Sequence, residues 1–173
     1  MKNIELKVKV DNIKPLVRSL RTLGAHFAGT LKQKDTYYNC HEGRLKIREI
    51  NGKEFMFIHY NRPDTASHKI SNFEILDLSK QQCLKLKKML WPTLGIKVTV
   101  VKTRKLWMYK NTRIHLDDVN GLGKFLELES KITTSERLAK KEYDALIEAL
   151  SLNNFIKIKK SYSDLLLANF VGR

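Results

Sequence analysis

The sequence predicts an antiparallel α+β protein in which strands outnumber helices. Short segments that alternate apolar and polar residues recur along the chain, and only three longer segments have helical spacing. Runs of consecutive strands, rather than a strict alternation of strand and helix, favour an antiparallel sheet. With 173 residues the chain has the length of one domain, and we expect a single domain over residues 1–173.

In the first half, residues 3–10 alternate strictly and predict a strand with one apolar and one charged face. Residues 12–23 then predict a helix with an apolar stripe, which Gly24 ends. Further strands are expected at 30–38, 44–48, 54–60 and 69–76. Asn51-Gly52 is a strong hairpin signal between two of these strands.

In the second half, Ser79 and Gln82 form a capping box that begins a helix over about 79–94. The remaining elements are expected strands at 96–109, 112–117 and 125–129, a helix at 135–151 and a short helix within 156–173. The run Lys85–Lys88 is interpreted as a solvated helix face, with binding of an external polyanion as the alternative.

The net charge of +15 predicts an anionic partner. The apolar runs are far too short to span a bilayer, and the N-terminus lacks the apolar region of a secretory signal. Two cysteines make neither a disulfide framework nor a metal cluster. We therefore expect a reduced, cytoplasmic setting and no membrane partner.

Several strands share one pattern, an apolar face and a face of ionisable residues of both signs. One interpretation is a sheet with a solvated face. The other is a closed barrel of about eight strands, with charges facing a wet lumen and helices covering the apolar outside. The cations on these faces are Lys7, Lys46, Arg48, Lys102, Arg104 and Arg113. The carboxylates are Glu5, Glu127 and Glu129, and in such a lumen they could hold Mg²⁺ or Mn²⁺ beside bound phosphates.

These residues resemble the CYTH domain superfamily, also called triphosphate tunnel metalloenzymes, and are most similar to its CyaB-like adenylyl cyclase branch. The family's N-terminal E-x-E-x-K strand is matched by Asn3–Lys7, with Asn3 in place of the first Glu. The segment Arg113–Glu129 is the most specific match. Further matches are Asp35–Tyr38, Arg44–Arg48, Arg62–Asp64, Ser71–Glu74, Val101–Leu106 and Ser161–Leu166.

The resemblance implies an eight-stranded antiparallel β-barrel, the triphosphate tunnel, with helices packed outside. It also implies a role for each charged residue. Phosphate contacts would be Lys46, Arg48, Lys102, Arg104 and Arg113; metal ligands would be Glu5, Glu127, Glu129 and Glu74. Lys7 would take the catalytic role, contacting a phosphate or helping to activate the attacking group. Asn3 removes one anionic group from the implied metal site.

The implied function is a metal-dependent enzyme acting on a small triphosphate, either inorganic triphosphate, thiamine triphosphate or ATP. Hydrolysis is slightly favoured, because it demands less orientation of the substrate than cyclisation of ATP to cyclic AMP. The alternatives are a non-catalytic polyphosphate or nucleotide binder and a nucleic-acid-binding protein. The last would gather its cations on an outer face, and nucleic acid is not the expected partner. A homodimer is an alternative to the monomer.

Overall fold

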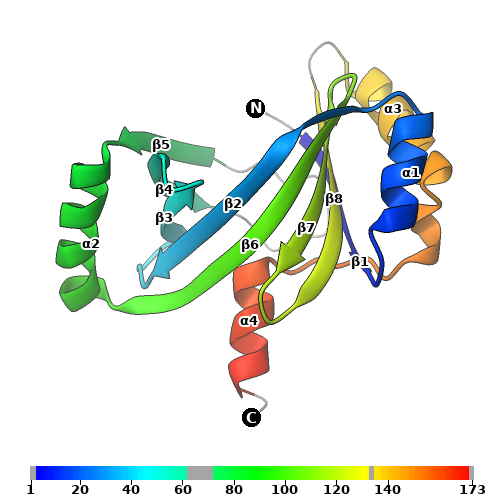
Figure 1. Ribbon diagram of the computed structural model, residues 1–173. Helices are drawn as coiled ribbons and strands as arrows, with labels where there is room; N and C mark the ends of the chain where they lie inside the picture. The colour runs from blue at the N-terminus through cyan, green and yellow to red at the C-terminus, as the bar shows by residue number, and fades with distance from the viewer. Residues whose placement is uncertain (1–2, 62–71, 133–134, 172–173) are drawn as a thin grey trace.

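A computed structural model describes residues 3–61, 72–132 and 135–171 of the chain (Figure 1). The strands are β1 (Asn3–Val10), β2 (His26–Tyr38), β3 (Arg44–Ile50), β4 (Glu54–Asn61), β5 (Asn72–Leu78), β6 (Ile96–Tyr109), β7 (Thr112–Val119) and β8 (Gly123–Lys131). The helices are α1 (Lys14–Thr22), α2 (Lys80–Leu94), α3 (Glu136–Ala149) and α4 (Tyr162–Val171), with a 3₁₀ turn at Leu152–Asn154. The predicted loop at Arg62–Asp64 and the predicted start of the fifth strand at 69–71 lie outside the described residues.

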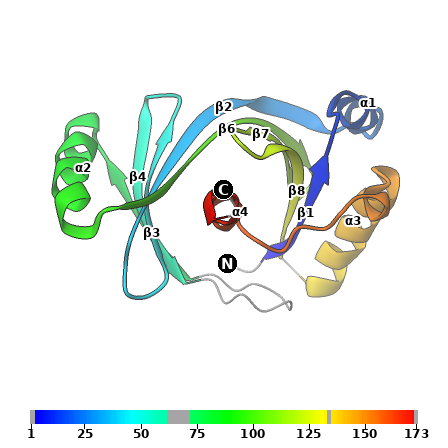
Figure 2. The ribbon, with the colours of Figure 1, turned by 90° about the horizontal axis from the view of Figure 1, so that it is seen from below.

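All eight strands join one antiparallel sheet in the order β1-β8-β7-β6-β2-β3-β4-β5. The two long strands β2 and β6 pair at its centre. Seen from below, the sheet curls around a central space (Figure 2). The predicted fold class, α+β with an eight-stranded antiparallel tunnel, is confirmed. Within the described residues the two edge strands do not pair with each other, so the tunnel is curled rather than closed.

Local sequence signals set the boundaries of these elements. Asn51 and Gly52 both have positive φ angles, 54° and 66°, as the expected hairpin turn between β3 and β4 requires. Ser79 accepts a hydrogen bond from the Gln82 amide, and the Gln82 side chain accepts one from the Ser79 amide. The predicted capping box therefore begins α2.

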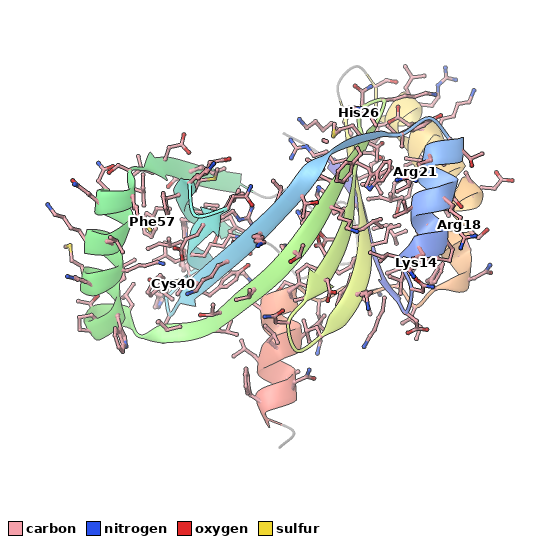
Figure 3. The ribbon with its side chains drawn as sticks, in the orientation of Figure 1. Lys14, Arg18, Arg21, His26, Cys40 and Phe57 are labelled. Carbon is pink, nitrogen blue, oxygen red and sulfur yellow. The ribbon has the colours of Figure 1, made fainter. Side chains whose placement is uncertain are left out.

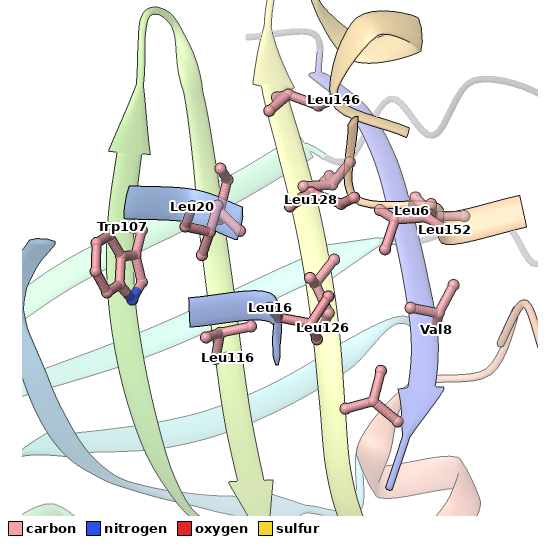
Figure 4. Close-up of a cluster of buried hydrophobic side chains, with 13 residues drawn as sticks. Leu6, Val8, Leu16, Leu20, Trp107, Leu116, Leu126, Leu128, Leu146 and Leu152 are labelled. Atoms are coloured by element: carbon pink, nitrogen blue, oxygen red, sulfur yellow. The ribbon is translucent and has the colours of Figure 1, made fainter. Parts of the chain in front are cut away.

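The apolar faces of the strands point outward and are covered by helices, as expected for a sheet with a charged lumen. Leu16 and Leu20 of α1 pack with Leu126 and Leu128 of β8, and Leu146 of α3 joins the same core (Figure 4). At the opposite side of the sheet, α2 covers a second outer core formed by Tyr38, Ile47, Phe55 and Cys83.

Helix α4 departs from the prediction that the helices pack outside. Both views place it at one end of the curled sheet, below its central space (Figures 1 and 2). Tyr162 and Leu166 pack with Val119 and Phe125, a cluster that also includes Val98. These strand residues point into the lumen, and because they are apolar at this end they need a cover, which α4 supplies.

Changing Leu20 to Ala should destabilise the fold by about 3 kcal/mol, because the side chain is fully buried and its loss leaves a cavity under α1. The matched control is Leu138→Ala on α3, where the side chain is 55% exposed and the change should be within about 0.5 kcal/mol. Urea denaturation of both variants measures the difference. Equal losses would contradict the assignment of α1 to the main core.

Candidate functional site

The concave face of the sheet encloses a cavity of about 450 Å³. It is lined by inward-facing side chains of all eight strands and by the start of α4. Nine of the ten predicted site residues line it: Glu5, Lys7, Lys46, Arg48, Lys102, Arg104, Arg113, Glu127 and Glu129. The first of the two interpretations, a sheet whose charged face is merely solvated, is therefore wrong for these residues.

Glu74 is the predicted site residue that does not line this cavity. It is exposed on β5 and lies opposite His59 of β4. The alternation of β5 instead turns Ile75 into the cavity, beside Ile58 of β4. Because successive side chains of a strand point to opposite faces, Glu74 points away from the other site residues.

Asp35, near the C-terminal end of β2, organises the first group of cations. It is 2% exposed and directly opposite Arg48 of β3. The guanidinium donates two parallel hydrogen bonds, from Nε to Oδ1 at 2.8 Å and from Nη2 to Oδ2 at 2.7 Å. Lys46 Nζ donates a third to Oδ2 at 2.9 Å. Burial alone would raise the pKa of Asp35, but Lys46 and Arg48 outweigh it and hold the carboxyl ionised, far below its usual range.

Asp117 of β7 repeats this arrangement with the cations of β6. Arg104 Nε donates to Oδ1 at 2.7 Å and Nη2 to Oδ2 at 2.6 Å, while Lys102 Nζ lies 3.7 Å from Oδ2. The Tyr162 hydroxyl of α4 donates to the same oxygen at 2.9 Å. Since β2 and β6 are neighbours, the two aspartate-centred groups lie side by side on the floor of the cavity.

Sequence reasoning did not select Asp35, Asp117 or Tyr162 as site residues. Asp117 had a usable signal, because it shares a strand face with Arg113 and His115. Asp35 had a weaker sequence signal, because the lysines near it in sequence, such as Lys34, lie on the opposite, exposed face of β2. Tyr162 could not be placed without knowing where the last helix docks.

Glu127 contacts ionisable side chains from three other strands. Its Oε1 lies 3.0 Å from Lys7 Nζ, and its Oε2 accepts a hydrogen bond from Arg104 Nη2 at 2.8 Å. His115 Nδ1 lies 3.5 Å from the same Oε2. Burial would raise the pKa of Glu127, but the charge of Lys7 and the contact with His115 hold it well below its usual range. The pKa of His115 is lowered by burial and by Arg104, which favours the neutral imidazole.

The remaining carboxylates offer hard oxygen ligands. Glu5 of β1 and Glu129 of β8 are directly opposite each other on the face toward the cavity, and Arg113 Nη1 lies 3.5 Å from Glu129. Like charges facing across two strands repel, and a cation between them would relieve that repulsion. The donor chemistry therefore fits Mg²⁺ or Mn²⁺. Across the described residues no three acidic, histidine or cysteine side chains are gathered as a metal cluster, and Glu127 pairs with Lys7 and Arg104.

Two lysines of the cavity have lowered pKa values. Burial, opposed by Asp35, brings the pKa of Lys46 to about 7. Burial first and the charge of Arg104 second lower the pKa of Lys102 to about 8. The Tyr162 ring stabilises two ammonium groups, lying 4.2 Å from Lys7 Nζ and 4.8 Å from Lys102 Nζ. The lumen thus holds cations that an anionic ligand would keep charged.

Fold and site together define a β-tunnel protein whose lumen brings cations and carboxylates together. A sequence model of the CYTH domain matches residues 1–162, and the chain belongs to the CYTH domain family. It is 28% identical over 176 residues to "Putative adenylate cyclase MJ0240" of Methanocaldococcus jannaschii, covering 95% of this chain and 98% of that protein.

Solved structures share the fold. The PH1012 protein of Pyrococcus horikoshii OT3 superposes with a TM-score of 0.78 at 24% identity, covering 94% of this chain and 98% of that one. HpAC1 of Hippeastrum has a TM-score of 0.72 at 13% identity, covering 98% of this chain and 96% of that one. HpAC1 is described as a "putative adenylyl cyclase" with a dominant triphosphatase activity.

On binding of tripolyphosphate, the two lysines should take up protons at pH 8 and almost none at pH 6. At pH 6 both lysines are charged before binding, whereas at pH 8 Lys46 is mostly neutral and Lys102 is half charged. A polyanion favours the charged form, so we expect the two lysines together to take up roughly one proton per ligand at pH 8. Calorimetry in two buffers of different ionisation enthalpy measures the uptake.

Lys46→Arg is the control for this experiment, since a guanidinium stays charged and removes the share of Lys46. The difference between the two proteins also cancels any proton lost by the ligand itself. The same uptake in the variant and the natural protein would contradict the role of Lys46.

Proposed function

We propose that the protein is a divalent-metal-dependent enzyme that acts on the phosphate chain of a small triphosphate, with hydrolysis as the favoured reaction. One observation carries the proposal most. Arg48 and Arg104, each held by a buried aspartate, face a single cavity that also contains opposed carboxylates on β1 and β8.

The phosphate chain would lie along the cations of the central strands. Guanidinium groups suit this task, because their planar donors match phosphate oxygens. Asp35 and Asp117 each take one edge of an arginine, which fixes its orientation before a ligand arrives. Phosphoryl transfer depends mainly on positioning and charge neutralisation, so an ordered set of cations is what the reaction requires.

Glu5, Glu127 and Glu129 would hold the metal, Mg²⁺ or Mn²⁺. A bound divalent cation supplies Lewis-acid polarisation of phosphate oxygens and neutralises developing charge. Lys7 lies beside this group: its ammonium contacts Glu127, donates to the Lys160 carbonyl oxygen at 3.2 Å and faces the Tyr162 ring. From there Lys7 would bind a phosphate oxygen or orient the attacking group.

Cyclisation of ATP is the second candidate. The name of the Methanocaldococcus jannaschii relative favours it, whereas the dominant triphosphatase activity of the Hippeastrum protein favours hydrolysis. Ile58, Ile75 and Leu106 also line the cavity, and such apolar side chains could contact a base or thiazole ring. Hydrolysis needs only a positioned water, while cyclisation must also orient the ribose 3′-hydroxyl, so hydrolysis remains first.

The deciding experiment incubates the protein with tripolyphosphate, thiamine triphosphate or ATP, each with Mg²⁺ or Mn²⁺, and identifies the products. Release of orthophosphate supports hydrolysis, and cyclic AMP with pyrophosphate supports cyclisation. If the protein binds these triphosphates but converts none of them, the proposal of an enzyme is wrong and the non-catalytic binder is supported.

Changing Glu127 and Glu129 together to Gln should lower turnover by at least about a hundredfold, because metal coordination supplies several kcal/mol of transition-state stabilisation. Metal-free binding of tripolyphosphate should persist or tighten, since the lumen becomes more positive. Product formation with metal and calorimetric binding without metal are measured on the same protein.

The reciprocal variant is Arg48→Ala, which should weaken metal-free binding first. The single variant Glu129→Gln is a control for loss of turnover through misfolding. It leaves Glu127 in place between Lys7 and Arg104 and is therefore less disruptive to the fold. Normal turnover in the double variant would exclude these carboxylates as the metal site.

A further inference from the structure

Helix α2 carries a concentration of positive charge that the proposed site does not use. The segment 79–97 contains five lysines, Lys80, Lys85, Lys87, Lys88 and Lys97, and no aspartate or glutamate. Lys87 pairs with Glu49 of β3. None of the described carboxylates forms an ion pair with Lys85 or Lys88.

The same helix exposes large apolar side chains. Its inner side packs on the sheet through Cys83, with Leu86 and Leu90 against the same core. On the remaining surface, Leu84 is 52% exposed, Met89 64% and Trp91 68%. Several large apolar side chains exposed on one helix beside lysines make this helix a candidate interaction surface. We call Leu84, Lys85, Lys88, Met89 and Trp91 the α2 surface.

The α2 surface is sterically accessible. Figures 1 and 2 both place α2 at the extreme edge of the molecule, outside the sheet and far from α1, α3 and α4. A flat partner could therefore approach it without meeting other helices and without covering the end of the lumen where α4 lies.

Charge and composition together identify the partner. A second copy of this chain would place lysines against lysines across a twofold interface, which repels. A nucleic acid would contact the lysines but leave the aliphatic side chains of Leu84 and Met89 without apolar contacts. An anionic bilayer provides contacts for both the lysines and the apolar side chains. Trp, Leu and Met enter the headgroup boundary, while the lysines contact lipid phosphates.

We propose that the α2 surface docks the protein on anionic phospholipid bilayers as a peripheral contact. In the described part of the chain, no helix is long and apolar enough to cross a membrane. The expectation of no membrane partner rested on the absence of an apolar span, an argument that does not apply to a helix lying on the surface. The proposal is independent of the proposed triphosphate chemistry.

Tryptophan fluorescence tests this directly, since the chain has two tryptophans and Trp107 is only 5% exposed. Vesicles of phosphatidylcholine with phosphatidylglycerol should shift the emission to shorter wavelength, and pure phosphatidylcholine vesicles should not. Trp91→Phe should abolish the shift while vesicle co-sedimentation persists in part. No shift with anionic vesicles, or an equal shift with neutral ones, would overturn the proposal.

Charge variants locate the contact. Lys85→Gln with Lys88→Gln should weaken vesicle binding about 25-fold, at roughly a factor of five per lysine near an anionic surface. The matched control is Lys14→Gln with Arg18→Gln on α1, which removes the same charge from an exposed face elsewhere (Figure 3). Equal losses in both variants would assign binding to net charge and overturn the proposal. So would stronger α2-dependent binding of single-stranded DNA than of vesicles.

Discussion

Burial of charge inside a curled sheet is the constraint on which the rest of this structure depends. Lys102 is 6% exposed and Lys46 equally so, and buried cations destabilise a protein unless they are paired and hydrogen bonded. Asp35 and Asp117 provide these partners, each from a strand that pairs with the strand carrying its cations. Each takes a bidentate arginine and a lysine, so the cations stay ordered and still face the cavity.

Charge on the inside of the sheet places apolar side chains on the outside. Leu126 and Leu128 pack in the outer core of the sheet, which α1 and α3 cover. At the end of the lumen the inward-facing side chains are apolar instead. There Phe125 points inward, and α4 covers it. Tyr162 links the two environments, because its ring packs on Phe125 while its hydroxyl donates to Asp117.

The sequence was sufficient for the features that depend on local pattern. Strict alternation in residues 3–10 separates Glu5 and Lys7 from Leu6 and Val8. In the structure Glu5 and Lys7 line the cavity, and Leu6 and Val8 pack in the core beneath the helices. Features that depend on contacts between residues far apart in the chain could not be predicted from local pattern alone. Alternation divides β5 into two faces without indicating which of them is inside; the resemblance placed Glu74 among the site residues, whereas the structure leaves it exposed and outside the cavity.

The sequence also could not indicate which charged residues form ion pairs with each other inside the lumen. Asp35 and Arg48 are 13 residues apart, and only the register of β2 on β3 places them opposite each other. Glu127 illustrates the same limit: its position on an E-x-E strand suggested a metal ligand, while its contacts with Lys7 and Arg104 follow from the pairing of β8 with β1 and from the position of β6.

The central claim is that a triphosphate binds inside the tunnel between the two aspartate-held arginines. The most direct measurement is a crystal structure of the protein with a non-hydrolysable imidotriphosphate. The account predicts phosphate oxygens within hydrogen-bond distance of both Arg48 and Arg104, with Asp35 and Asp117 still holding the opposite edges of the two guanidinium groups. Ligand bound only to lysines of the outer surface, with the lumen unchanged, would contradict it.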